Sequence, residues 1–65
     1  MNITVNAKAH KVAAQTLAAA LEELGFTSPA IATALNGQFV PRPARAATAL
    51  HDGDRLEVLA PMQGG

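Results

Sequence analysis

The first twelve residues carry the pattern of two short strands. In MNITVN, the apolar Ile3 and Val5 alternate with polar side chains, which is the period of two that a half-buried strand shows. A turn in the stretch NAKA would return the chain as a second strand over 9–12, with His10 and Val12 on one face. Alanine has little preference for strands, so this second strand depends mainly on the turn.

The period changes after Thr16. Leu17, Leu21 and Leu24 follow one another at i, i+4 and i+7, which predicts a helix of about two and a half turns with one apolar stripe. Thr16 can cap its N-terminus. Gly25 suits the left-handed position after the last helical residue, and the phenylalanine behind it can fold back onto the helix in a Schellman ending.

The stretch IATALNGQFV predicts a hairpin of 31–35 against 38–40. Its two apolar runs are joined by Asn36-Gly37, a pair that tolerates the positive φ angles of a type I′ turn. The two prolines of PRPARAATAL then break the sheet, and the alanines between and after them favour a helical crossover that ends near Leu50.

The final strand is predicted from RLEVLA, which follows an Asp-Gly turn in HDGD. Leu56 and Val58 point to one face and Leu59 to the other. Pro61 cannot donate to a sheet ladder, so the strand should stop at Ala60. Five extended residues beyond it would reach roughly 17 Å.

Together these elements predict an α+β roll with the helix packed on the first and last strands. We expect one domain over 1–60, because 65 residues support a single small core. Residues 61–65 are expected to form a flexible tail. Its two glycines, Gly64 and Gly65, would let a narrow partner channel close around the last carboxylate, although chain ends also fray without any function.

Composition excludes several classes of protein. The net charge is zero and the two aromatic residues are Phe26 and Phe39, a combination that disfavours nucleic acid as a partner. Cysteine is absent, which excludes disulfides and thiolate chemistry. No apolar run approaches the length of a membrane span and no signal segment is recognisable. A cytoplasmic protein with no membrane association, monomeric when free, is therefore expected.

The sequence offers little catalytic chemistry. His10 and His51 have no serine or acid at a spacing that indicates a nucleophile pair, and two histidines without cysteine are an incomplete metal set. Asp52 and Asp54 flank a glycine, which is typical of a turn. We therefore predict a protein that is not an enzyme.

Several charged residues invite a choice between partner contacts and solvent. Glu22 and Glu23 lie in the last helical turn, where the helix dipole disfavours acids, so they are expected to be solvated or paired with a partner's cations. Arg42 and Arg45 either pair with acids of a partner or remain solvated along the crossover. Leu59 is either an exposed apolar anchor for a partner or packed beneath the crossover.

Three stretches together, ALNGQFVPR, DGDRLEVL and the terminal GG, resemble the ThiS family of sulfur carriers in thiamin biosynthesis. That family has the ubiquitin-like β-grasp fold, and the resemblance implies a mixed sheet of about four to five strands packed on one main helix. The resemblance runs from the hairpin to the last residue. In the family the first turn usually contains glycine, whereas NAKA has none, which leaves the geometry of the first hairpin open.

The resemblance also implies a mechanism. The carboxylate of Gly65 would be adenylated by an E1-like adenylyltransferase of the ThiF type, which uses ATP and magnesium, so that the carrier itself binds no cofactor. A persulfide donor would then supply sulfur, and the resulting C-terminal thiocarboxylate would be delivered to a thiazole synthase of the ThiG type. Partner recognition would fall on Leu59 and Arg42 and on the tail residues Pro61, Met62, Gln63 and Gly64.

Two alternatives remain open on the sequence. The small subunit of molybdopterin synthase shares the fold, the Asp-Gly-Asp type of turn and the terminal Gly-Gly, and it delivers sulfur to a pterin. A β-grasp protein without sulfur chemistry would be a binding module, or a modifier joined through Gly65 to a lysine.

Overall fold

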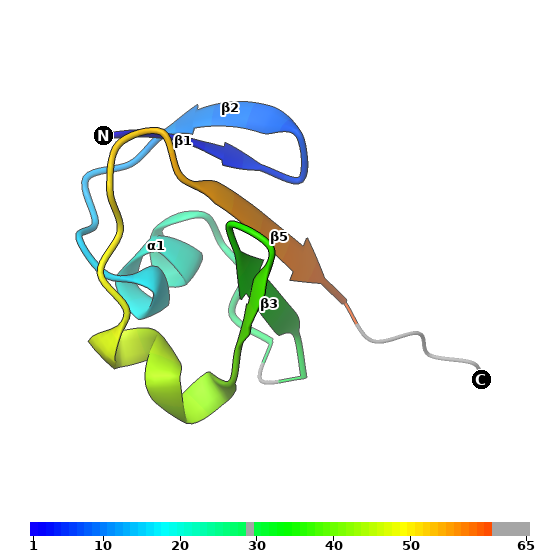
Figure 1. Cartoon of the computed structure of the whole chain (residues 1–65). Helices are drawn as coiled ribbons and strands as arrows, with labels where there is room; N and C mark the ends of the chain where they lie inside the picture. The colour runs from blue at the N-terminus through cyan, green and yellow to red at the C-terminus, as the bar shows by residue number, and fades with distance from the viewer. Residues whose placement is uncertain (29, 61–65) are drawn as a thin grey trace.

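The computed structural model describes residues 1–28 and 30–60. Five strands form one mixed sheet in the spatial order β2-β1-β5-β3-β4, and the helical segments lie together on one side of it (Figure 1). The strands are β1 (Asn2–Val5), β2 (Lys8–Lys11), β3 (Ala32–Leu35), β4 (Gln38–Val40) and β5 (Arg55–Leu59). The helices are α1 (Leu17–Glu23) and the 3₁₀ helix η1 (Arg42–Ala47). The predicted α+β roll is confirmed.

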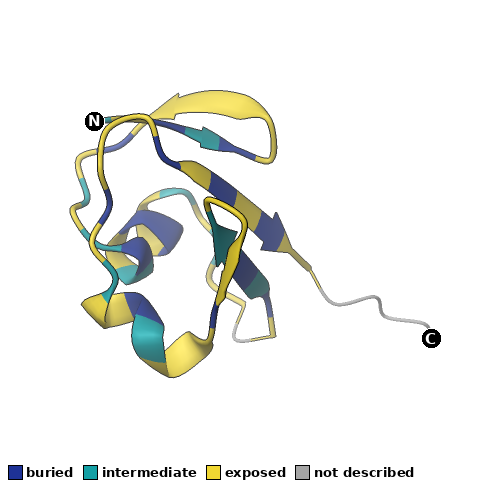
Figure 2. Cartoon of the chain, in the orientation of Figure 1, coloured by how far each residue is buried: buried dark blue, intermediate teal, exposed yellow. Residues whose placement is uncertain are grey.

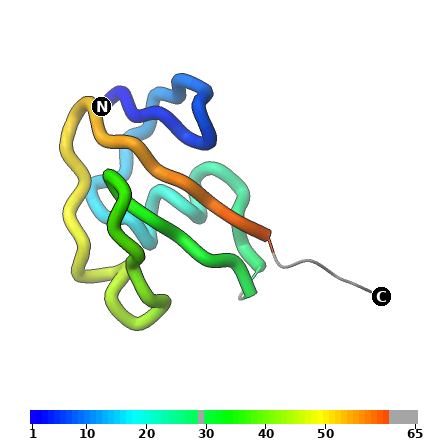
Figure 3. Tube along the Cα trace, turned by 45° about the vertical axis from the view of Figure 1, so that its right-hand side comes forward, coloured from blue at the N-terminus to red at the C-terminus, as the bar shows by residue number. Residues whose placement is uncertain are grey.

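The last strand in sequence occupies the middle of the sheet. β5 pairs in parallel with β1, through Thr4 opposite Arg55, and antiparallel with β3, through Leu35 opposite Leu56. The trace in Figure 3 follows β5 between the first strands and the second hairpin. The remaining strands, β2 and β4, therefore form the two edges.

The core lies between the sheet and α1. Its buried apolar residues are Ile3, Val5, Val12, Leu17, Ala20, Leu21, Ile31, Val40, Leu50, Leu56 and Val58. On β5 the exposed and buried residues alternate strictly, as the colours along that strand show (Figure 2). The predicted contact of the helix stripe with Ile3, Val5, Leu56 and Val58 is confirmed.

The helix has the predicted ends. The Thr16 hydroxyl accepts from the Ala19 N–H at 3.2 Å, which satisfies one of the free donors at the N-terminus. At the other end Gly25 has φ +89. Its N–H donates to the Glu22 carbonyl and the Phe26 N–H donates to the Leu21 carbonyl, the pair of bonds that defines a Schellman motif.

Glu23 is neither simply solvated nor left for a partner, which corrects the expectation for this residue. Its carboxylate accepts from the N–H groups of Ala13 and Ala14 at 3.0–3.1 Å. It thereby ties the last turn of α1 to the segment that enters the helix. The sequence prediction failed here because the nearest donors lie nine and ten residues away and meet Glu23 only once the helix has folded back.

The second strand also differs from its prediction. β2 begins at Lys8 and is exposed throughout, whereas Val12, immediately after it, is buried. Val12 and His10 therefore do not share a half-buried face. As an edge strand, β2 pairs with β1 alone, and Val12 enters the core because the chain leaves the sheet there towards α1.

Both hairpin turns place their central residues at positive φ. Asn36 and Gly37 have φ of 52° and 84°, so the predicted type I′ turn is confirmed. The first turn consists of Asn6 and Ala7, with φ of 48° and 70°. The chain thus forms a turn of the same kind without glycine, and Ala7 adopts a conformation that is costly for a residue with a Cβ atom.

The asparagine of each turn also holds the central strand. Asn6 Oδ1 accepts from the Val58 N–H at 2.8 Å and its Nδ2 donates to the Val58 carbonyl at 3.1 Å. Asn36 Oδ1 accepts from the Arg55 N–H at 2.9 Å, and its Nδ2 donates to the Asp54 carboxylate at 3.0 Å. β5 is thus bonded by side chains from both neighbouring hairpins.

The turn before β5 is organised by its two aspartates. Asp52 accepts from the Asn2 N–H at 2.6 Å, and Asp54 accepts from the His51 N–H at 2.8 Å. The Asn36 amide, followed by the bond from the His51 N–H and the charge of His51, lowers the pKa of Asp54 below its ordinary value of 3.8, and burial opposes this effect. The prediction of turn chemistry for Asp52 and Asp54 is confirmed.

Replacing Ala7 with glycine should stabilise the protein. Glycine removes the steric cost of the left-handed conformation at φ 70°, and after its larger loss of chain entropy the expected gain is about 0.5–1 kcal/mol. The matched control is Ala19→Gly in α1, which should lose about 1 kcal/mol. Urea denaturation measures both, and equal losses in the two variants would contradict the left-handed turn.

Asp54 should contribute to stability in a pH-dependent way. Because its pKa is lower in the folded state, the contribution is complete above about pH 3.8 and is lost as the pH falls through the folded-state value. Asp54→Asn should cost about 1 kcal/mol at neutral pH and should weaken the acid dependence. Denaturation midpoints from pH 6 to pH 2 test this, with Glu57→Gln on the exposed face of β5 as control. Parallel curves for the wild type and Asp54→Asn would contradict it.

Candidate functional site

The site that the sequence predicts follows the end of β5. β5 ends at Leu59, one residue before the predicted end, and its last pair is with Ala32 of β3. Ala60 is exposed and belongs to no strand. The predicted tail residues lie outside the described part of the chain: Pro61, Met62, Gln63, Gly64 and Gly65.

An apolar surface borders this end of β5. Leu59 and Phe39 are each 68% exposed. Strand pairing places Leu59 opposite Ala32 and Phe39 opposite Ala34, and paired residues share a face while alternate residues return to it. These four residues therefore lie on the face turned away from α1, and we call them the outer patch.

The outer patch resolves the choice for Leu59. The side chain faces away from the core, as one of the two alternatives predicted, and it does not pack beneath the crossover. Large apolar side chains exposed on one face of a small domain often mark an interaction surface. Phe39 was not predicted as a site residue from the sequence. The available signal was the alternation of the strand: because Val40 faces the core, Phe39 next to it must face outward.

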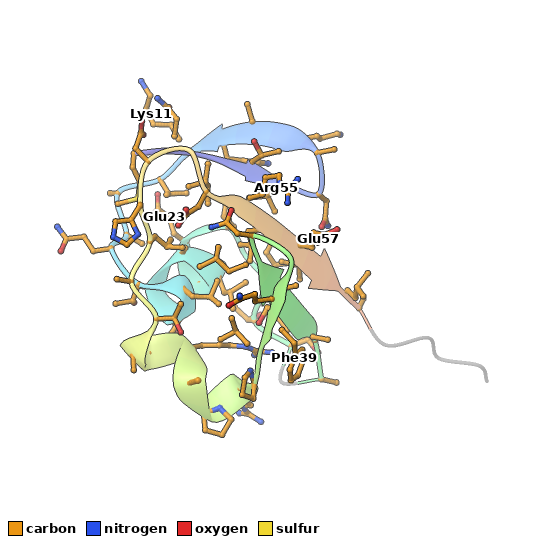
Figure 4. The ribbon with its side chains drawn as sticks, in the orientation of Figure 1. Lys11, Glu23, Phe39, Arg55 and Glu57 are labelled. Atoms are coloured by element: carbon orange, nitrogen blue, oxygen red, sulfur yellow. The ribbon has the colours of Figure 1, made fainter. Side chains whose placement is uncertain are left out.

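Charged groups lie beside the patch on the same face. Arg55 and Glu57 alternate with the buried residues of β5, and Figure 4 shows them along that strand, with Phe39 on the neighbouring hairpin. A cleft of about 360 Å³ opens here between β5 and the first turn, lined by Thr4 and Asn6 among others. β1 and β5 pair at two positions. Beyond them the side chain of Asn6, in place of a further strand residue, bonds to β5, and the cleft lies at this point.

The two crossover arginines have different roles. Arg42 is exposed at the start of η1. Arg45 is 7% exposed, with Nε donating to the Thr33 hydroxyl at 3.1 Å and Nη2 to the Ile31 carbonyl at 2.6 Å. The alternative in which Arg45 remains solvated along the crossover is therefore wrong. The 3₁₀ turn points its side chain inward, where it ties η1 to the start of β3.

The candidate docking residues Leu59 and Arg42 do not come together. Leu59 lies on the outer face of the sheet, whereas Arg42 belongs to η1 on the helical side.

The two histidines also lie apart from each other, since His10 lies on the exposed edge strand and His51 in the turn before β5. Residues 1–28 and 30–60 contain no group of three metal-ligating side chains. Within those residues, no helix is long and apolar enough to cross a membrane.

A five-stranded mixed sheet with the last strand at its centre and one α-helix across one face defines a β-grasp domain of the ubiquitin-like class. The family model described as the ThiS family matches residues 3–65. The chain therefore belongs to the ThiS family. The match reaches the terminal Gly-Gly and extends over nearly the whole chain.

Solved structures agree with this assignment. The chain is similar to the crystal structure of a thiamine biosynthesis protein (ThiS) from Geobacter metallireducens, with 35% identity over the whole of both chains and a TM-score of 0.85. It is also similar to a solution structure of a thiamine biosynthesis protein from the same organism. There the identity is 36%, the coverage is 100% of this chain and 88% of the other, and the TM-score is 0.80.

A longer curated relative is also similar to the chain. It is a thiazole synthase of Paramagnetospirillum magneticum, 36% identical over 66 residues. The match takes in all of this chain and 20% of the relative. The chain therefore spans about a fifth of the length of this curated relative.

Proposed function

We propose that this protein carries sulfur for thiazole formation as a thiocarboxylate on Gly65. One observation carries the proposal: the ThiS family match continues through the final Gly-Gly. The described part of the chain fits a carrier because it supplies a rigid domain whose central strand ends next to an exposed apolar surface. The reactive group would be the carboxylate at the end of the chain, and the catalytic groups would belong to its partners.

The chemistry begins with activation of the carboxylate. Its oxygen attacks the α-phosphorus of ATP, pyrophosphate leaves, and the product is an acyl adenylate on Gly65. A partner must supply magnesium and cationic groups to stabilise the developing charge. The terminal sulfur of a persulfide then attacks the acyl carbon and AMP leaves. The product is an acyl disulfide that joins Gly65 to the donor. A thiol then attacks the donor's sulfur, the S–S bond breaks, and a disulfide and the thiocarboxylate on Gly65 are formed.

Two enzymes would handle the carrier in turn. The first is an E1-like adenylyltransferase of the ThiF type, and the second is a thiazole synthase of the ThiG type that accepts the sulfur. Similarity of the chain to one fifth of a protein described as a thiazole synthase supports the second partnership, because a carrier-like segment within such a protein indicates a shared task. The carrier would act as a protein co-substrate in the cytoplasm.

The outer patch is the surface that we propose for docking. Leu59 and Phe39 are the two large apolar side chains exposed among the described residues, and Leu59 lies one residue from the end of the described chain. A partner that covers this surface is guided to the start of the tail. Burial of both side chains contributes on the order of 1.5–3 kcal/mol each.

Removal of Gly64 and Gly65 should abolish thiocarboxylate formation without unfolding the domain. Within the described part of the chain, all buried apolar residues lie between Ile3 and Val58. The melting temperature should therefore stay within about 2 °C, because the free energy of unfolding should change by less than about 0.5 kcal/mol. Intact mass spectrometry after incubation with ATP, a cognate adenylyltransferase and a persulfide donor measures the oxygen-to-sulfur exchange.

Gly65→Ala is the matched control, because it keeps the terminal carboxylate and adds a single methyl group. It should slow the exchange without abolishing it. An unchanged mass for the wild-type chain under the same conditions would overturn the proposed function.

Charges placed in the outer patch should impair docking. Phe39→Asp and Leu59→Asp should raise the KM of the adenylyltransferase for the carrier at least about tenfold, which corresponds to about 1.4 kcal/mol. Stability should change by less than about 0.5 kcal/mol, because both side chains are exposed. Ala47→Asp at the end of η1, also exposed, is the matched control. Equal KM values for all four proteins would refute docking through this patch.

A further inference from the structure

A second concave surface lies on the helical side of the molecule. A cleft of about 520 Å³ runs between α1, residues 26–28 and η1. Three charged residues line it, namely Arg42, Arg45 and Glu22. Hydroxyl groups of Thr16, Thr27 and Ser28 complete its polar lining. The outer patch belongs to the opposite face of the sheet and shares no residue with this cleft.

The guanidinium of Arg45 gives the cleft its chemistry. Arg45 is more than nine-tenths buried, and its two acceptors in the described chain, the Thr33 hydroxyl and the Ile31 carbonyl, are both neutral. A buried cation without an anion is unfavourable. Residues 1–28 and 30–60 leave no fully buried side-chain nitrogen without a partner. Nη1 of Arg45 bonds to none of these residues, and the cleft is the open space that Arg45 lines.

Neighbouring groups add donors to the same space. Thr16 Oγ1 and Ser28 Oγ each accept a backbone N–H, which leaves both hydroxyl hydrogens available to an incoming acceptor. Arg42 contributes a second, exposed guanidinium on the rim. The cleft thus offers several donors around one fixed cation, which is the arrangement that binds an oxyanion.

The charge balance favours a carboxylate. Two arginines and one glutamate line the cleft, which leaves one net positive charge. Glu22 would repel a phosphate dianion more strongly than a singly charged group. The apolar part of the lining, including Leu21 and Phe26, suits the methylene groups of an acidic side chain.

We propose that this cleft receives the carboxylate of an aspartate or glutamate side chain from a protein partner. Arg45 also bonds to Ile31, the neighbour of Ala32, which pairs with Leu59 at the end of β5. The cleft is therefore connected through one strand to the end of β5. That the partner is one of the enzymes that handle the carrier depends on the proposed function, whereas the carboxylate site itself does not.

Binding of a minimal probe tests the site without any partner enzyme. The ¹⁵N-labelled full chain at low ionic strength is titrated with N-acetyl-glutamate methylamide, and N-acetyl-glutamine methylamide serves as the neutral matched probe. Saturable shifts are expected for Arg45 Nε–H and for the amides of Thr27 and Ser28, with the acidic probe alone. Shifts of equal size with the neutral probe, or none that saturate, would overturn the proposal.

Three variants complete the test. Arg42→Gln should weaken binding of the acidic probe about two- to fivefold, as expected for loss of one exposed charge. Glu22→Gln should strengthen it by a similar factor, and Arg55→Gln on the outer face should leave it unchanged. These side chains are not part of the core, so the variants should fold. Tighter binding of inorganic phosphate than of the acidic probe, or an unchanged affinity in Arg42→Gln, would refute a carboxylate site.

Failure of this test and failure of the carrier function are distinguishable. The titration requires neither ATP nor sulfur, and the thiocarboxylate assay does not require the cleft probe. If the chain acquires sulfur but does not bind the acidic probe, the proposed carrier function is supported and the proposed carboxylate site is refuted.

Discussion

The whole architecture depends on the pairing of β5 with a strand on each side. β5 is the last of the described strands in the sequence, yet it joins β1 and β3, which would otherwise belong to two separate hairpins. Leu56, at its centre, is 1% exposed. Asn6 and Asn36 add side-chain bonds to β5 from both sides. Because an isolated two-stranded hairpin is at best marginally stable in water, neither half of the sheet is expected to persist without this strand.

The residues of the same strand alternate between the core and the proposed docking surface. Leu56 and Val58 face α1, whereas Glu57 and Leu59 face outward. Under the proposed docking, a substitution at Leu59 alters partner binding, whereas one at Val58 alters folding. The arginines of the crossover show the same division, since Arg45 is buried as a support for β3 and Arg42 is exposed. One short segment thus supplies both a buried and an exposed cation.

The sequence predicted the features that depend on local patterns. Leucine spacing, the threonine cap and the Asn36-Gly37 turn identified α1 and the second hairpin, because their determinants lie within a few residues. It did not predict features that depend on distant contacts. The bonds that the Ala13 N–H donates to Glu23 and that Arg45 donates to Ile31 join segments that meet only after folding. Of the candidate site, the exposed Leu59 was among the expected alternatives, while Phe39 and the cleft required the register of the sheet and the packing of η1.

The central position of β5 has a mechanical consequence. Sheet hydrogen bonds lie across the strands, so tension applied to the chain beyond Ala60 runs along β5 and loads its bonds to β1 and β3 simultaneously, in shear. An edge strand pulled from its end would have neighbours on one side alone. An enzyme that draws the end of this chain into a deep active site would therefore pull on the strand that is bonded on both sides. The domain would resist unfolding under such a force.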